Sequence, residues 1–553
     1  MRLKSIPALL CALSAGHAWS QSVPDAGQTM RELQRPAVPA PAKEAPRIAV
    51  TPERPAMSTP DGAKIPVKSF QVTGAQRFAA ADLGTLLAPW AGRELSMPEL
   101  REAAARITRH YREAGYLVAR AYVPAQTMRD GVVEIAVLEG RLGKIELKNG
   151  SRVADGQARA LLGNIRSGDP VVGPTLEHSL GLLNQTPGVG RAGAVLQPGS
   201  GVGLSDLVVA LEPGPLVSGA IDADNHGNRY TGNARLGATV HVNSPLGLGD
   251  QFSMRYVHSD DDLQYGRLAY RAPIGADGLV LGASIASSRY RLGEDFAPLD
   301  VNGDALTTSV FASYPFLRSA ALNLTGSVSA DGKKLQDRVA AVQLVTDKSV
   351  KSFTAGVAGH GRSGATEYSF SAGYTRGDLD IESAAVLAAD AATARTQGKY
   401  GKLAYFGSGT MALSGPWSAY VGINGQIASK NLDSSEKFSL GGPDGVRAYP
   451  QGEAPSDQGY LGTAEIRYAL PATGLGAMRV AAFIDHGHAR VNRNPFVPGV
   501  NSRKLSGAGV GLNWYGPWNT ALNASLAWKL GDAKPTSDKD RSARAWLQVT
   551  KYF

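Results

Sequence analysis

The residues best suited to chemistry are an arginine in a glycine-rich segment and an aspartate in a later one. Arg447 lies in residues 438–450, which read FSLGGPDGVRAYP, and Asp485 lies in the segment Phe483-Ile484-Asp485-His486-Gly487. A planar guanidinium can bind a carboxylate through two parallel hydrogen bonds, whereas a lysine acts as a point charge. The pair therefore indicates a charge-assisted contact that pins the Arg447 segment inside a hollow structure. The alternative is that both are ordinary charged residues with other partners.

No other group of residues predicts a catalytic, metal or cofactor site. His486 and His488 flank a glycine, but no third ligand follows at a recognisable spacing. Residues 507–511 read GAGVG and lack the helix and acidic partner of a nucleotide-binding fingerprint. Gly199-Ser200-Gly201 lies in a turn-rich connector and not on a strand-to-helix elbow. We therefore expect no enzyme activity, no cofactor and no bound metal.

The N-terminus predicts export from the cytoplasm. Basic residues precede an apolar run at residues 6–15 and small residues follow it, which predicts a signal peptide over residues 1–20. Cys11, the only cysteine, lies in this segment, so the exported chain would carry no thiol or disulfide. No later window has the ~18 consecutive apolar residues of a spanning helix, which disfavours an inner-membrane protein. The net charge of +9 is spread along the chain, so we expect no nucleic acid partner.

Residues 21–65 have the composition of a linker. Seven prolines between residues 36 and 60 prevent regular structure over most of it. Only Asp25 to Arg35 could form a helix, which Pro36 would end. From composition alone, the segment is a disordered spacer.

Two α+β modules are predicted next, over residues 66–140 and 141–214. In the first, a capping box at Ser96 and Glu99 starts a helix that Gly115 ends. The second module shows the same order of strands and helices, but its sequence patterns are less distinct. The strands expected in the first are 67–73, 116–123 and 132–138, and the strands in the second are 145–148, 192–197 and 207–211, with helices near 157–162 and 175–185.

Residues 215–553 predict a transmembrane β-barrel. Short alternating segments are separated by glycine, asparagine and aspartate turns, as in residues 460–470, where polar residues share one face and apolar residues the other. Alternation over residues 479–485 places Asp485 on the inner face. Roughly 340 residues at about 20 per strand and turn give about sixteen antiparallel strands. The chain ends on Phe553, which shares the outer face with Leu547 and Val549.

These segments, in this order, resemble the two-partner secretion transporters of the hemolysin secretion/activation family, which belongs to the barrel-insertase superfamily. In that family the loop motif is Val-Arg-Gly-aromatic, and here it reads Val446-Arg447-Ala448-Tyr449. The modules resemble polypeptide-transport-associated (POTRA) domains. The resemblance implies a pore-plugging helix, a loop folded inward near residues 438–458, and Phe553 as an assembly signal. The implied site residues are Asp25, Met30 and Leu33 for the plug and Gly441, Gly442, Val446, Arg447, Tyr449, Phe483, Asp485 and Gly487 for the loop lock.

The resemblance also implies the function. It predicts a type V secretion transporter in the bacterial outer membrane, whose periplasmic POTRA domains capture a β-helical exoprotein for passage through the pore. The client would be a hemolysin, an adhesin or a contact-dependent toxin; outer-membrane lipids and the barrel assembly machinery would be further partners. Two other interpretations stay open, namely a barrel-assembly or translocation-assembly factor of the same superfamily and a passive porin. Ala448 replaces the family glycine, and we expect it to keep a negative φ with Arg447 inside the barrel.

Overall fold

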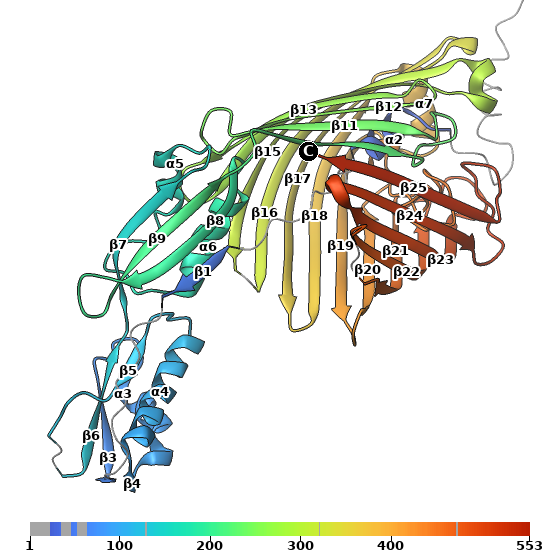
Figure 1. Cartoon of the computed structure of the whole chain (residues 1–553). Helices are drawn as coiled ribbons and strands as arrows, with labels where there is room; N and C mark the ends of the chain where they lie inside the picture. The colour runs from blue at the N-terminus through green and yellow to red at the C-terminus, as the bar shows by residue number, and fades with distance from the viewer. Residues whose placement is uncertain (1–22, 35–45, 52–63, 128–129, 320, 472–473) are drawn as a thin grey trace, which may run out of the picture.

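The computed structural model describes residues 23–34, 46–51, 64–127, 130–319, 321–471 and 474–553. The predicted signal peptide lies outside these ranges. Two α+β modules precede a closed β-barrel, as Figure 1 shows from blue to red along the chain. None of the helices that the structure describes is both long enough and apolar enough to cross a membrane.

The first module begins near Ile65. Its long helix α4 starts at the predicted capping box, in which the Ser96 backbone N–H donates to Glu99 Oε2 at 2.7 Å. One apolar face of α4 packs on a sheet of order β3-β6-β5. The elements are β2 (Ile65–Val67), β3 (Ser69–Thr73), α3 (Ala80–Leu86), the 3-10 turn η1 (Ala88–Trp90), β4 (Arg93–Leu95), α4 (Met97–Glu113), β5 (Arg120–Tyr122) and β6 (Val132–Leu138).

Two strand predictions in this module were wrong in extent. The strand expected over residues 116–123 is only β5, because the chain before it bonds to the second module instead: Leu117 N–H donates to the Val171 carbonyl at 3.2 Å. The strand expected over residues 67–73 is broken at Lys68, whose N–H donates to the Gly131 carbonyl at 2.7 Å. Both differences arise from hydrogen bonds between segments that are distant in sequence. A local sequence pattern does not reveal such partners.

The second module has a four-stranded sheet of order β1-β8-β9-β7. Two helices cover it and share a buried leucine-rich core with the sheet. Strand β1 (Arg47–Val50) comes from the proline-rich linker and pairs in parallel with β8, for example Ile48 beside Ala194. The linker was not predicted to contain a strand. The other elements are β7 (Arg141–Asn149), α5 (Asp155–Leu161), α6 (Gly173–Gln185), β8 (Val189–Pro198) and β9 (Leu204–Pro213).

The barrel has sixteen antiparallel strands, the number expected, and closes where β10 pairs with β25. Helix α6 packs against β15, so the two modules sit at one end of the barrel, called here the proximal end. The strands are β10 (Val217–Asp224), β11 (Arg235–Asn243), β12 (Gln251–Ser259), β13 (Gln264–Ile274), β14 (Leu279–Arg291), β15 (Val301–Arg318), β16 (Leu322–Val339), β17 (Leu344–Ser363), β18 (Thr366–Ile381), β19 (Gly398–Ala412), β20 (Trp417–Ala428), β21 (Gln458–Ala469), β22 (Ala477–Arg490), β23 (Ser502–Gly516), β24 (Thr520–Lys529) and β25 (Ala543–Tyr552).

Alternation along the strands separates two faces. In β22, Val480 and Ile484 are exposed on the outer face, while Asp485 is fully buried on the inner one. Phe553 lies on the outer face, and its backbone pairs with Gly219 across the seam between the first and last strands. Lys551, also exposed, donates to the carbonyl of Trp518 at the proximal rim, in the turn η5 (Pro517–Asn519). Other short elements in the connections are η2 (Glu294–Leu299), η3 (Ala340–Val342), α7 (Ala384–Ala392) and η4 (Ser434–Glu436).

Candidate functional site in the barrel lumen

Two segments that belong to no barrel strand lie inside the barrel. One is helix α2 (Ala26–Leu33), and the other is the connection between β20 and β21, residues 429–457, called here the inner loop. Figure 1 shows α2 enclosed by the strands. Both are largely buried, although neither is part of the wall. They occupy part of the lumen.

Close backbone approaches fold the tip of the inner loop. The Val446 N–H donates to the Leu440 carbonyl at 2.7 Å, and the Gly442 N–H donates to the Tyr449 carbonyl at 3.1 Å. A Cβ atom on Gly441 would lie 2.3 Å from the Pro450 carbonyl oxygen, and Gly442 has a φ of +109°. The two glycines are therefore required by the turn itself.

At this tip, Arg447 and Asp485 are in direct contact. Arg447 Nε donates to Asp485 Oδ2 at 2.9 Å and Nη2 donates to Oδ1 at 2.8 Å. The Arg447 backbone N–H donates to the same carboxylate at 3.1 Å, and so does Thr463 Oγ1 at 3.0 Å. The contact thus joins the loop to strands β21 and β22 through a two-pronged, charge-assisted arrangement.

Further groups complete the environment of the guanidinium. Arg447 Nη1 lies 2.9 Å from Glu465 Oε1, and the guanidinium carbon lies 3.2 Å from the centre of the Phe483 ring. Burial alone would lower the pKa of Arg447, but the hydrogen bonds and charges of Asp485 and Glu465 together outweigh burial and raise it. The loop charge is therefore held in the cationic form by its partners.

The residues beside Arg447 fit the wall closely. Tyr449 is fully buried and its hydroxyl donates to the Ala533 carbonyl at 3.0 Å; burial raises the pKa of this phenol to about 12. Val446 is also fully buried, and a Cβ on Gly487 would come within 3.4 Å of its Cγ2 atom. Trp546 Nε1, on β25, donates to the Arg447 carbonyl at 2.8 Å. The loop is thus fixed at backbone and side chain alike.

Ala448 does not have a positive φ. Its methyl group points at β23, where a Cβ on Gly507 would lie 2.6 Å from Ala448 Cβ. The alanine at the usual glycine position is thus matched by a glycine on the facing strand. Gly507 belongs to the glycine-rich segment that resembled half of a nucleotide fingerprint, and its role here is to make room.

Two buried acids also anchor the inner loop, and sequence reasoning missed both. Glu453 accepts hydrogen bonds from Arg503 Nη2 at 2.7 Å and from the Thr536 and Ser537 backbone N–H groups at 2.7 and 2.9 Å. Asp457 accepts from the Arg493 backbone N–H at 2.7 Å and, within the loop, from Lys437 Nζ at 2.6 Å. Both acids are fully buried. The sequence does show two acids just before the strand β21, but the residues that bind them lie far along the chain, so their anchoring role could not be predicted.

Comparison with known proteins identifies the chain. A family model described as "Haemolysin secretion/activation protein ShlB/FhaC/HecB" matches residues 203–514, and a ShlB-type POTRA model matches residues 65–140. The chain belongs to this family. It is an outer-membrane transporter of the two-partner secretion class, with its POTRA domains in the periplasm.

Among relatives, the heme/hemopexin transporter protein HuxB of Haemophilus influenzae is 29% identical over 98% of this chain and 98% of its own. Among solved structures, CdiB from Escherichia coli has a TM-score of 0.71 at 19% identity and covers 96% of both chains. CdiB from Acinetobacter baumannii has a TM-score of 0.64 at 19% identity, covering 93% of this chain and 95% of its own. At these identities, the structural matches support the fold alone.

In this transporter, α2 lies against β14, β15, β16 and η4. Asp25 caps the helix by accepting from the Gln28 N–H at 2.8 Å, and the Ala26 N–H donates to Asp337 on β16 at 2.8 Å. Met30 and Leu33 are buried among apolar side chains of the wall, including Tyr265. Gly27 touches the inner loop, since a Cβ there would lie 2.8 Å from the Ser435 backbone nitrogen.

An ionic cluster beside α2 links the inner loop to the wall. Glu436 in η4 lies 2.5 Å from Lys333 Nζ and 2.8 Å from Lys402 Nζ, and Asp433 lies 2.9 Å from Lys348 Nζ. Burial would raise the pKa of Glu436, but the charges of Lys333 and Lys402 outweigh burial and lower it to about 2. The Asp25 carboxylate approaches Lys348 at 4.0 Å. Helix α2 and the inner loop thus share one group of cations.

The lumen is not completely filled. A cavity of about 680 Å³ lies beside the C-terminal end of α2 and is bordered by Leu33 and Gln34. Its wall carries several cations on β12, β13 and β16 and one acid. These charged residues are Arg255, Arg267, Arg271, Asp331 and Lys333.

Proposed function

We propose that α2 and the inner loop close the resting pore, and that a secreted partner protein opens it by taking the place of β1 in the second POTRA sheet. The observation that carries this proposal is the pairing of β1 with β8. It joins the segment that follows the plug helix to a sheet edge suited to binding a client.

In each module one sheet strand lies at an edge although it is the second in chain order, counted among β3, β5 and β6 in the first module and among β7, β8 and β9 in the second. In the first module that strand is β5, whose outer side pairs with no strand that the structure describes. In the second it is β8, whose outer side is covered by β1. Sheet edges bind extended peptides through main-chain hydrogen bonds. A client strand could therefore add to β5 directly but would have to displace β1 to reach β8.

Displacement of β1 would act on α2 through the linker that joins them. Helix α2 ends at Leu33 and β1 begins at Arg47, so the two are joined by a short linker. Only four residues of β1 pair with β8, from Arg47 to Val50. Such a short edge strand is replaced at low cost by a longer client strand. Once β1 is free, α2 loses the tether that keeps it near the pore.

We propose as client a large secreted β-helical protein with amphipathic N-terminal strands, of the hemolysin, adhesin or contact-dependent toxin type. The relative HuxB is named as a heme/hemopexin transporter, and the Proteus mirabilis relative HpmB as a hemolysin transporter. These names apply to those two proteins alone. We further propose that Arg447 and Asp485 lock the loop, that Asp25, Met30 and Leu33 seat the plug, and that the assembly machinery reads Phe553. Outer-membrane lipids would cover the apolar outer face.

A disulfide between β1 and β8 tests the proposal. Ala49 and Val195 are register partners on the exposed face of the sheet, and the predicted mature chain has no other cysteine. In cells producing Ala49→Cys/Val195→Cys, secretion of the partner should fall at least tenfold under oxidising conditions and recover on reduction. Each single cysteine variant is the control. Unchanged secretion with the cross-link formed would show that β1 need not leave β8.

A further inference from the structure

A hollow of about 750 Å³ lies in the barrel wall formed by β14 to β19. The inner faces of these strands are fixed by their partners in the lumen: Lys333, Lys348 and Lys402 all contact acids of the inner loop. Residues an odd number of positions away along the same strands therefore face outward. By this rule Lys351 and Lys399 lie on the outside of the barrel. Arg376 on β18 does so too, because its cross-strand partner Phe353 is five residues from Lys348; all three cations are exposed.

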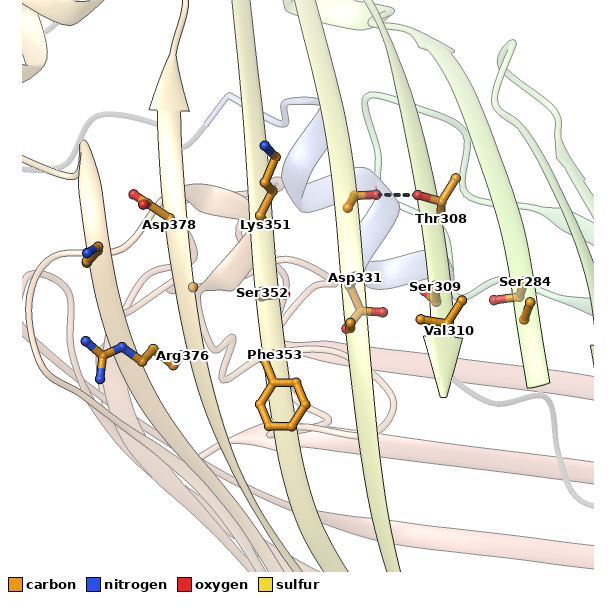
Figure 2. Close-up of a pocket in the computed structure, with 15 residues that line it drawn as sticks. Ser284, Thr308, Ser309, Val310, Asp331, Lys351, Ser352, Phe353, Arg376 and Asp378 are labelled. Atoms are coloured by element: carbon orange, nitrogen blue, oxygen red, sulfur yellow. Dashed lines mark hydrogen bonds between the residues drawn. The ribbon is translucent and has the colours of Figure 1, made fainter. Parts of the chain in front are cut away.

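Register places these cations in two adjoining rows. In the upper row Gly332, Lys351, Asp378 and Lys399 are successive cross-strand partners. In the lower row Ala330, Phe353 and Arg376 are partners. Figure 2 shows Lys351 and Asp378 above Phe353 and Arg376. The small residues Gly332 and Ala330 leave the hollow open between the cations and Val310.

The rows lie at one edge of the apolar belt. Below them, the outward residues of β17 and β18 are apolar and exposed, including Val357, Phe370 and Tyr374. Eleven residues, 352 to 362, separate Lys351 from Ser363 at the proximal end of β17, which is about the length of a tilted strand that crosses the hydrocarbon core. Since the proximal end is periplasmic, the cations lie at the level of the outer-leaflet headgroups. A charge on the lipid face costs much at the midplane and little there.

None of the three cations forms an ion pair within 4 Å with a residue that the structure describes, although Asp378 lies between two of them in the row. The exposed Arg289 and Arg338 on the same face differ, because both pair with Asp304 at 3.0 Å. The lining also includes Asp331, but this acid lies two residues from Lys333 on β16 and therefore faces the lumen, where it borders the cavity beside α2. On the outer face, three cations against Asp378 leave a net positive charge. Phe353 and Val310 add an apolar border on the membrane side.

We propose that this hollow binds a phosphorylated headgroup of an outer-leaflet lipid. Lys351, Arg376 and Lys399 bind the phosphate oxygens, and Phe353 and Val310 contact the acyl chains. The site lies outside the pore, so it is independent of the transport steps proposed above. It gives the barrel a specific lipid contact on the wall that faces α2.

The test uses the purified full-length transporter in detergent and titrates it with fluorescent lipid A that carries its phosphates. Lys351→Gln/Arg376→Gln should weaken binding at least tenfold, whereas the matched variant Arg289→Gln/Arg338→Gln should stay within twofold of the unaltered protein. Equal binding by the two double variants would overturn the proposal.

Two ligand controls on the unaltered protein decide the question even if a variant fails to fold. Dephosphorylated lipid A should bind at least tenfold more weakly; equal binding would refute recognition of the phosphate. Inorganic phosphate at millimolar concentration should not displace lipid A. Displacement at that concentration would identify a site for free anions and refute the lipid as occupant.

Discussion

Helix α2 and the inner loop fill the same lumen but are held in different ways. The loop tip is fixed by a fully buried carboxylate, several backbone contacts and side chains that fit wall glycines. The helix is held by its cap, by the Ala26 N–H bond to Asp337, by apolar packing of Met30 and Leu33, and by Asp25 at 4.0 Å from a lysine. Arg31 Nη2 also donates to Ser439 Oγ of the inner loop at 2.9 Å. We therefore expect α2 to leave the lumen more easily than the loop, whose release would separate the buried Arg447–Asp485 pair.

The largest effect is expected from Arg447→Ala, which leaves Asp485 buried without its cation. Breaking a buried pair by removing one partner costs about 3–5 kcal/mol. We expect the melting temperature of the purified barrel to fall and secretion of the partner to be lost. Arg447→Lys should be intermediate because a lysine cannot form both hydrogen bonds. Arg467→Ala, which removes a lumen arginine of the wall, is the control; an equal effect there would contradict a special role for Arg447.

The second-largest effect is expected from protonation of Glu436, which should open the pore at low pH. Its pKa in the folded protein, about 2, is below the value of about 4.3 for a free glutamate. The stabilisation is therefore fully present above about pH 4.5 and is lost as the pH falls toward 2, by about 3 kcal/mol in total. Pore conductance in planar bilayers should rise over that range. Glu436→Gln should remove the pH dependence; its persistence would assign the opening to another group.

A smaller effect, about 2 kcal/mol, is expected from Gly507→Ala. The new methyl group would meet Ala448 Cβ at 2.6 Å and push the loop tip from β23. Thermal unfolding should show the loss, and Ala448→Gly should restore stability in the double variant. Gly511→Ala on the same strand has room, with its nearest contact at 3.7 Å, and should be neutral. Without rescue by Ala448→Gly, the two positions would not be complementary.

The smallest effect is expected from Asp25→Ala. Loss of an N-cap costs about 1 kcal/mol, which corresponds to a roughly fivefold shift in the occupancy of the plug. The open fraction in single-channel recordings should rise by about that factor, with no change in the melting temperature of the barrel. Asp25→Ser keeps a capping oxygen and should retain most of the closure. A lowered melting temperature would instead make α2 part of the wall structure.

Local sequence patterns were sufficient to predict much of this architecture. Alternation placed Asp485 inside, and the capping box located the start of α4. What the sequence did not reveal depends on partners far along the chain. Strand β1 is four residues among prolines and exists only because β8 offers an edge. The pairing of Ala448 with Gly507 and the anchoring of Glu453 by Thr536 likewise require the closed barrel.

The cavity beside α2 has an electrical consequence. On its border Arg255 and Lys333 are paired with Asp222 and Glu436, which leaves Arg267 and Arg271 against Asp331. Mobile ions inside the cavity therefore experience a positive potential. Any current that leaks through the resting pore along this side would be carried mainly by anions. Ion selectivity measured on the closed state therefore reports which wall of the lumen the leak follows.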